Sequence, residues 1–205
     1  MTRVEPVSDG ILREAIQLVR DGGLVAYPTD TVYGLGCDPF NPGAVERLAA
    51  VKERSKMLLP ILIDNMDTAR RLGILSSTAE RVANMFWPGV VTLVVPSRVI
   101  LSMITEESNT IGLRVPGHAF ARKLVGECGG ALVGTSANIS GRPSCKTAEE
   151  VLENLDGRID LIIDGGPAQD KESSVVKIIE DDVTIIREGQ IPNEAILRVV
   201  RDIVV

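Results

Sequence analysis

Residues 24–36 read LVAYPTDTVYGLG, and this stretch indicates the fold class more clearly than any other. Its first four residues are apolar, as in a short strand that is buried in a sheet. The next nine include two hydroxyls, a carboxylate, a phenol and two glycines. In open α/β sheets, ligands bind in loops at the carboxyl ends of strands, and glycines let the backbone approach them closely. The stretch therefore predicts a buried strand followed by a ligand-binding loop, and the alternative is a turn held by side-chain hydrogen bonds.

Helical and strand-like segments alternate along the chain around this stretch. Predicted helices cover residues 8–21, 43–52, 67–73, 77–86, 119–127, 147–155 and 192–204. Predicted strands cover residues 24–27, 61–63, 90–95, 110–115, 131–133, 160–164, 174–179 and 183–187. The last two strands are joined by three acidic residues and predict an antiparallel hairpin. We therefore expect one α+β domain over residues 1–205, a mixed sheet of about seven strands flanked by helices.

The composition limits the classes of function. The chain has 205 residues, and 44% of them are hydrophobic, which is enough for a sizeable core. Lys and Arg number 22 against 28 Asp and Glu, which gives a net charge of −6. This balance, with only 3% aromatic residues, argues against a generic polyanion-binding protein and a base-stacking surface. His118 is the single histidine, so a His-rich metal site is excluded and we expect no resident metal ion.

Cysteine usage and the chain start bear on the compartment. Cys37, Cys128 and Cys145 are odd in number and form no CxxC pair, which predicts reduced thiols inside a cell. Cys37 follows a glycine-rich turn and is either a reactive thiol or a small apolar filler. Residues 1–10 lack the apolar core of a signal peptide, and no apolar stretch reaches the ~20 residues of a membrane span. We expect a cytoplasmic protein with no membrane partner.

Basic residues gather at the end of the helix predicted over residues 43–52. Lys52, Arg54 and Lys56 lie within five positions of one another. Arg forms forked hydrogen bonds with phosphate and Lys acts as a point charge, so the three are suited to clamp a polyphosphate. The alternative is that these cations only complement the carboxyl end of the helix dipole.

An arginine interrupts the apolar strand predicted over residues 110–115. Burying Arg114 is costly unless it is paired, so we expect it to meet a carboxylate, either in the protein or on a ligand. His118 follows shortly after, where it is a helix cap, a packing residue or a catalytic group.

Short hydrogen-bonding side chains follow the predicted strand 131–133. Residues 135–144 read TSANISGRPS and supply hydroxyls, an amide and exposed backbone N–H groups. Such a loop suits the recognition of phosphate or ribose oxygens, and the alternative is a turn rich in Ser and Asn. The sequence has neither GxxxxGK[ST] nor GxGxxG, so a nucleotide site here is of another kind.

Several segments in one order resemble a known family. PTDTVYGLG, KER, WPGVVTLVV, GLRVPGH, TSANISGRPS and SSVV…IIREGQI run from residue 28 to about residue 191. This combination is similar to the YrdC-like family of threonylcarbamoyl-AMP synthases. The resemblance implies a twisted mixed sheet and a nucleotidyltransferase that converts L-threonine, bicarbonate and ATP into threonylcarbamoyl-AMP and pyrophosphate. It further implies ATP with Mg²⁺, a role in tRNA modification, and downstream tRNA threonylcarbamoyl transferase proteins that take the product.

The resemblance also implies roles for individual residues. Those with a catalytic role are Lys52 and Arg54. Those that bind ATP are Lys52, Arg54, Thr135, Ser136, Asn138, Ser144, Ser174 and Arg187. Those that bind L-threonine are Thr29, Thr31, Tyr33 and Arg114.

The chain departs from the family pattern in places. Residues 55–61 (SKMLLPI) are apolar and offset by one residue from the segment that often follows the KER motif, which has Pro and then a Pro-Leu pair. Ile63 or Asp64 stands where longer members have a histidine. The resemblance is to a short, single-domain form without the extra domain of long members. Two alternatives to the synthase are a YciO-type paralogue with weak or different nucleotide activity and a protein that binds double-stranded RNA or tRNA.

Overall fold

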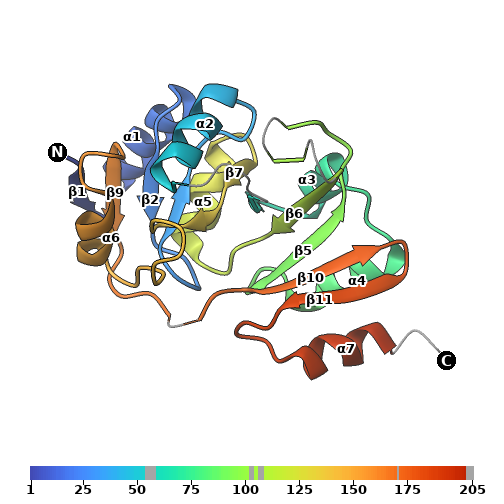
Figure 1. Cartoon of the computed structure of the whole chain (residues 1–205). Coiled ribbons are helices and arrows are strands. Elements are labelled where there is room, and N and C mark those ends of the chain that lie inside the picture. The colour runs from blue at the N-terminus through green and yellow to red at the C-terminus, as the bar shows by residue number, and fades with distance from the viewer. Residues whose placement is uncertain (54–58, 102–103, 106–108, 170, 202–205) are drawn as a thin grey trace.

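The computed structural model describes residues 1–53, 59–101, 104–105, 109–169 and 171–201. These residues form seven helices and eleven strands, and the strands make two mixed sheets. The expected mixed α/β class is confirmed, and so is the antiparallel hairpin of β10 (Ser174–Ile179) and β11 (Asp182–Arg187). Figure 1 shows the two sheets side by side, with β1 at one end of the molecule and α7 (Asn193–Arg201) at the other.

The five-stranded sheet contains the strand predicted over residues 24–27. Its spatial order is β1 (Arg3–Pro6), β9 (Leu161–Asp164), β2 (Val25–Tyr27), β3 (Gly34–Gly36) and β8 (Thr135–Ser136). Strands β1 and β2 run parallel to β9, whereas β3 runs antiparallel to both β2 and β8. The loop between β2 and β3 is therefore a hairpin connection at the carboxyl end of β2.

Both faces of this sheet are covered by helices. Val25 and Tyr27 of β2 pack with helices α1 (Asp9–Arg20) and α5 (Ala119–Glu127). Ala26 points to the opposite core, which includes α2 (Pro42–Val51) and α6 (Ala148–Leu155). Alternate side chains of a strand face opposite sides of a sheet, so a strand covered on both sides reads as a continuous apolar run.

The six-stranded sheet forms the other half of the molecule. Its spatial order is β11, β10, β5 (Val91–Pro96), β6 (Thr110–Arg114), β4 (Ile61–Ile63) and β7 (Ala131–Val133). Helices α3 (Met66–Leu72) and α4 (Ser77–Phe86) pack against β4 and β5, and α7 packs against α4. Apolar residues of β4 and β5 pack with those of α3 and α4 in one hydrophobic core.

The two sheets are joined through Gly134, which connects β7 to β8. Its N–H donates to the carbonyl of Pro60 at 2.8 Å, and the neighbouring N–H of Val133 donates to Cys37 at 3.0 Å. A Cβ at Gly134 would lie 2.4 Å from Cγ of Leu62, so only glycine lets the chain pass this closely. The close crossing brings the loops of the two sheets together.

The arrangement differs from the expected single sheet of about seven strands. Strands β1, β3 and β8 fall outside the predicted strands. The last two, Gly-Leu-Gly and Thr-Ser, have almost no apolar pattern. They are strands because their backbone groups pair with neighbours, which a hydrophobic pattern does not record. No helix in the described part of the chain is long and apolar enough to cross a membrane.

Candidate functional site

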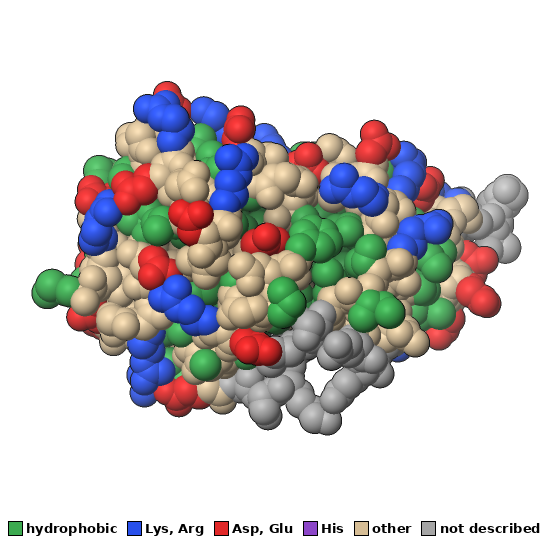
Figure 2. All heavy atoms as spheres, turned by 90° about the horizontal axis from the view of Figure 1, so that it is seen from above, with side chains coloured by type: hydrophobic (Ala, Val, Ile, Leu, Met, Phe, Trp, Pro, Cys, Tyr) green, Lys and Arg blue, Asp and Glu red, His purple; other side chains and the backbone are tan. Residues whose placement is uncertain are grey.

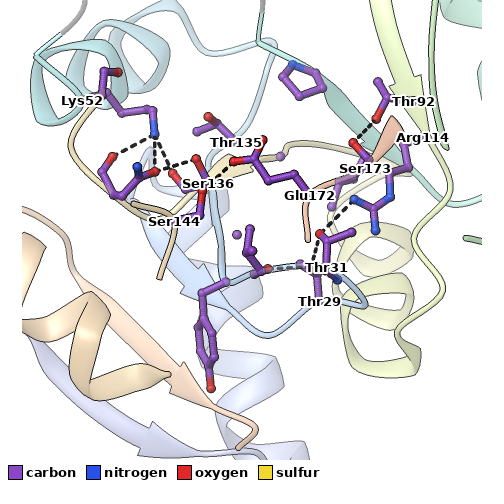
Figure 3. Close-up of a pocket in the computed structure, with 18 of the residues that line it drawn as sticks. Thr29, Thr31, Lys52, Thr92, Arg114, Thr135, Ser136, Ser144, Glu172 and Ser173 are labelled. Atoms are coloured by element: carbon purple, nitrogen blue, oxygen red, sulfur yellow. Dashed lines mark hydrogen bonds between the residues drawn. The ribbon is translucent and has the colours of Figure 1, made fainter. Parts of the chain in front are cut away.

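A cavity of about 320 Å³ lies where the two sheets meet. Its walls come from the loop after β2, from the segment that begins with β8, and from residues of β5, β6 and β11. The residues singled out from the sequence that line it are Thr29, Thr31, Tyr33, Lys52, Arg114, Thr135, Ser136, Asn138, Ser144 and Arg187. Arg54 and residues 55–58 lie outside the described residues. Segments that are far apart in sequence thus converge on one site (Figure 3).

Lys52 is the C-cap of α2 and is only 3% exposed. Its Nζ donates to the carbonyl of Ser136 at 2.6 Å and to the carbonyl of Asn138 at 2.9 Å, with Oδ1 of Asn138 at 3.4 Å. These acceptors satisfy an ammonium group that would otherwise be costly to bury. The side chain therefore ties the end of a helix to the loop after β8, at the wall of the cavity.

The loop after β8 is held by its own polar side chains. Oγ of Ser136 donates to Oδ1 of Asn138 at 2.6 Å, and Nδ2 of Asn138 donates to the carbonyl of Arg142 at 2.6 Å. The N–H of Ala137 donates to the carbonyl of Tyr33 at 2.8 Å, which joins this loop to the one after β2. The loop is thus a Ser- and Asn-rich turn, as the alternative from the sequence has it, and it also lines the cavity.

The loop after β2 forms a tight hydroxyl-stabilised turn. Oγ1 of Thr29 accepts from the N–H of Thr31 at 3.0 Å and donates to the carbonyl of Val32 at 2.6 Å. The hydroxyl of Tyr33 donates to the carbonyl of Gly166 at 2.8 Å and accepts from the N–H of Gly165 at 3.1 Å. Burial raises the pKa of Tyr33 to about 12. Its phenol is thus neutral and fixed to the backbone beside the cavity.

Arg114 meets the carboxylate that its position in an apolar strand predicts. The guanidinium forms an ion pair with Asp30, donates from Nη1 to Oγ1 of Thr31 at 3.2 Å and donates from Nε to the carbonyl of Gly89 at 2.8 Å. Burial lowers the pKa of Arg114, and the Asp30 charge opposes that shift. The other carboxylate oxygen of Asp30 accepts from the N–H of Gly117 at 2.8 Å, so the pair is fixed from both sides.

The opposite wall is a chain of polar contacts that the sequence did not reveal. Glu172 accepts from Oγ of Ser144 at 2.6 Å and forms an ion pair with Arg187. Arg187 also donates to the carbonyl of Ser173 at 3.1 Å from Nε and at 3.0 Å from Nη2. Oγ of Ser173 lies 2.9 Å from Oγ1 of Thr92 on β5. Four segments of the chain thereby close this side of the cavity.

Residues 172–174 are fixed by glycine and serine. A Cβ at Gly189 would lie 2.4 Å from the backbone of residues 172–174, so a side chain there would push this wall away. The hydroxyl of Ser174 is fully buried, donates to the carbonyl of Ile191 at 2.7 Å and accepts from the N–H of Gly189 at 3.0 Å. Ser174 is not among the residues that line the cavity, and it holds the wall from behind.

Other sequence candidates have structural positions. His118 is the N-cap of α5, where its Nδ1 accepts from the N–H of Ala121 at 3.4 Å. Cys37 is fully buried, and burial raises its pKa to about 12, so it behaves as the apolar filler. Ile63 is also fully buried in the core, and Asp64 accepts from the hydroxyl of Thr68 at 2.7 Å.

Five polar residues of the cavity have no individual role assigned from the sequence. They are Thr92, Glu172 and Ser173, together with Ser140 and Arg142 inside the loop 135–144 that was singled out. The one signal that could have found any of them outside the 135–144 loop is a polar residue in an apolar strand, which applies to Thr92, 3% exposed on β5. Glu172 and Ser173 carry no such signal, because their place depends on how β10 pairs with β5.

The electrostatics of the cavity favour an anion. Among its described residues, four side chains are basic and only Glu172 is acidic; the basic residues are Lys52, Arg114, Arg142 and Arg187. Backbone N–H groups and hydroxyls surround them. Cations and neutral donors in a partly enclosed site bind phosphate or carboxylate groups strongly. The described lining contains neither histidine nor cysteine, so the arrangement is suited to binding and charge neutralisation more than to proton transfer.

Known proteins share this sequence pattern and this fold. The family model described as "Sua5_yciO_yrdC: Telomere recombination" matches residues 17–189. The threonylcarbamoyl-AMP synthase of Pyrococcus abyssi (strain GE5 / Orsay) is 37% identical over 97% of this chain and 60% of that protein. The structure of P. abyssi Sua5 complexed with L-threonine has a TM-score of 0.92 at 36% identity, over 97% of this chain and 61% of that one. The E. coli YciO structure has a TM-score of 0.86 at 26% identity, over 93% and 97%.

Coverage of these relatives is unequal. The chain spans about three fifths of the length of the P. abyssi synthase and nearly all of E. coli YciO. The residues that the family model matches, 17–189, include every described residue that lines the cavity, from Tyr27 to Arg187.

Proposed function

Since the chain belongs to the Sua5_yciO_yrdC family, we propose that it is an ATP-dependent threonylcarbamoyl-AMP synthase, a nucleotidyltransferase that acts in tRNA modification. The observation that carries the proposal is the cavity between the sheets, where four basic side chains and a set of hydroxyls face one acidic group. Such a site fits a polyanion beside a small amino acid. The similarity to a threonine-bound structure supports the second ligand.

The ATP phosphates are assigned to the wall around Lys52. Its ammonium group, the hydroxyl of Ser136 and the amide of Asn138 lie within one hydrogen-bonded cluster. Thr135 and Ser144 add hydroxyls, and Arg187 adds a guanidinium from the far side. Arg54 is assigned to the same phosphates from its sequence position. Mg²⁺ arrives with ATP and is held mainly by phosphate oxygens and water, as this ion usually is in nucleotide sites.

L-Threonine is assigned to the wall around Arg114. A guanidinium has five N–H groups, and the described contacts with Asp30, Thr31 and Gly89 use three of them. The other two are available for the carboxylate of the amino acid, which takes two parallel hydrogen bonds well. The turn of Thr29 and Thr31 lies directly beside this position (Figure 3).

The chemistry needs few titrating groups. The amine of L-threonine attacks the carbon of bicarbonate, and loss of water leaves a carbamate. A carbamate oxygen then attacks the α-phosphorus of ATP in line, and the bond to the β-phosphate oxygen breaks to release pyrophosphate. Lys52 and the arginines neutralise the charge that develops on the phosphates, and the walls hold the reactants in contact.

The product sets the partners that we propose. A mixed anhydride with AMP is labile and must pass to proteins that transfer the threonylcarbamoyl group to tRNA. We propose that this transfer takes place in the cytoplasm. An RNA-binding role has less support. On the face in Figure 2, the described Lys and Arg side chains are interspersed with Asp and Glu and do not form one basic surface.

The decisive experiment measures pyrophosphate release from ATP. With purified protein, we expect release only when both L-threonine and bicarbonate are present, with omission of either as the control. Pyrophosphate release at the same rate with and without L-threonine would refute the synthase activity and favour the YciO-type alternative. Affinity for double-stranded RNA that falls steeply with salt, without such turnover, would favour the RNA-binding alternative.

A further inference from the structure

One carboxylate stands in an otherwise cationic cavity. The side chain of Glu172 is 35% exposed and lies between the wall of Lys52 and Ser144 and the wall of Arg114 and Ser173 (Figure 3). It is the only acidic residue among the described residues that line the site. A fixed negative charge repels the phosphates of ATP, so the presence of Glu172 in this cavity requires an explanation.

The contacts of Glu172 are those of a phosphate group. Its Oε1 accepts from the hydroxyl of Ser144 at 2.6 Å, and its Oε2 pairs with the guanidinium of Arg187. A hydroxyl and a forked guanidinium are typical phosphate ligands. The two donors come from separate segments, the loop after β8 and the end of β11, and the carboxylate bridges them.

We propose that Glu172 occupies the phosphate subsite formed by Ser144 and Arg187, and that the ATP phosphates displace it from both. The inference rests on the proposed function, which assigns these two donors to ATP. Glu172 then lowers the affinity that the basic residues give the site for nucleotide. Its ion pair with Arg187 keeps the subsite assembled until a phosphate replaces it.

Displacement predicts a definite cost in affinity. When a site is open only in part of the population, its apparent affinity falls by that fraction. A partly exposed ion pair is worth at most about 1 kcal/mol, which corresponds to about fivefold in affinity. Removing the carboxylate should therefore tighten the binding of ATP about fivefold.

The opposite outcome would identify another role. A carboxylate near phosphates is also a ligand for Mg²⁺. In that case the loss of Glu172 weakens the binding of ATP in the presence of Mg²⁺ and leaves binding without Mg²⁺ unchanged. Displacement predicts tighter binding without Mg²⁺, so the sign of the effect separates the two roles.

The test is the dissociation constant of ATP without Mg²⁺, measured by calorimetry on the full chain, with a parallel series in Mg²⁺ to detect a role as a metal ligand. Glu172→Gln keeps the size and removes the charge, and we expect about fivefold tighter binding. Glu172→Asp keeps the charge but is too short to bridge both donors, and it should also bind more tightly. The matched control is Glu80→Gln. Glu80 lies on α4, is also 35% exposed and pairs with Arg70 of α3 at 2.8 Å. We expect no change in that variant.

Each result decides the inference. Unchanged or weaker binding of ATP by Glu172→Gln would overturn displacement. So would tighter binding by Glu172→Gln if Glu172→Asp binds ATP no more tightly than the unaltered protein. Neither result contradicts the proposed synthase activity. Failure of the unaltered protein to bind ATP both with and without Mg²⁺ would refute the proposed function and this inference with it. If Glu172→Gln does not fold, as judged by its thermal transition, Glu172→Ala is measured in its place with the same expectation.

Discussion

Nζ of Lys52 lies 2.6 Å from the carbonyl oxygen of Ser136, although the two residues are 84 positions apart in the chain. This contact joins the carboxyl end of α2 to the loop after β8. It makes the lysine a structural tie, and the proposed function makes the same lysine the cation that faces the ATP phosphates. The two roles are separable by measurement.

Replacing Lys52 should affect both activity and stability. Lys52→Met keeps the aliphatic stem but removes the ammonium that donates to the carbonyls of Ser136 and Asn138, of which the first keeps the N–H of Asn138 at 3.0 Å. The loss costs about 1–3 kcal/mol of unfolding free energy. Pyrophosphate release should also be lost, because the phosphate charge is no longer neutralised. Chemical denaturation and the release assay measure the two effects.

The control for that variant is Lys123→Met. Lys123 is 56% exposed and pairs with Asp9 at 2.9 Å on the surface, so its loss should change stability by no more than about 0.5 kcal/mol. Near-normal pyrophosphate release in Lys52→Met would contradict the assignment of the phosphate wall.

Arg114→Lys tests the threonine subsite. Lysine keeps the positive charge but cannot make the forked contacts with Asp30, Thr31 and a ligand carboxylate. We expect the KM for L-threonine to rise about tenfold or more, with a much smaller change in the KM for ATP. Steady-state kinetics with each substrate varied in turn measures this. An equal rise in both constants would show that Arg114 acts only through the fold.

Gly134→Ala tests the crossing of the two sheets. The added methyl group would lie 2.4 Å from Cγ of Leu62, and such overpacking costs about 1–3 kcal/mol. Gly10→Ala is the control, since Gly10 is in helix α1 and its new Cβ would meet Oγ of Ser8 at an ordinary 3.8 Å. Denaturation should therefore show a loss for the first variant and none for the second. Equal stability of both would mean that the sheets tolerate separation here.

Stability should fall at alkaline pH because of Cys37. Burial raises the pKa of its thiol to about 12, while the same thiol in the unfolded chain titrates near its ordinary pKa of 9.0. The unfolded state therefore loses its proton first, and the contribution of the neutral thiol is complete below pH 9 and lost as pH rises toward 12. Denaturation across this range should show a shallower decline in Cys37→Ala. An identical decline would assign the effect to other groups.

The sequence predicts the apolar elements of the fold well and their arrangement less well. Val25–Tyr27 and Ile61–Ile63 are recognisable because both faces of each strand are buried. Gly34–Gly36 and Thr135–Ser136 are not, since they are strands through backbone pairing alone. Whether the strands form one sheet or two depends on which edges pair, and hydrophobic patterns carry no such information.

The site divides along the same line. Lys52, Ser136 and Asn138 could be singled out because cations and small polar groups cluster at the ends of apolar elements. The position of Arg114 in an apolar strand predicts that it pairs with a carboxylate, and Asp30 is that partner. Glu172 could not be found this way, because its contacts with Ser144 and Arg187 exist only once three distant segments have folded together.

The central claim is tested most directly by identifying the product. Protein incubated with ATP, L-threonine and isotope-labelled bicarbonate should form threonylcarbamoyl-AMP that carries the label in its carbamoyl group, as seen by mass spectrometry. Pyrophosphate should appear in equal amount. Hydrolysis of ATP without an adduct of threonine and AMP, or an adduct that lacks the label, would contradict the account.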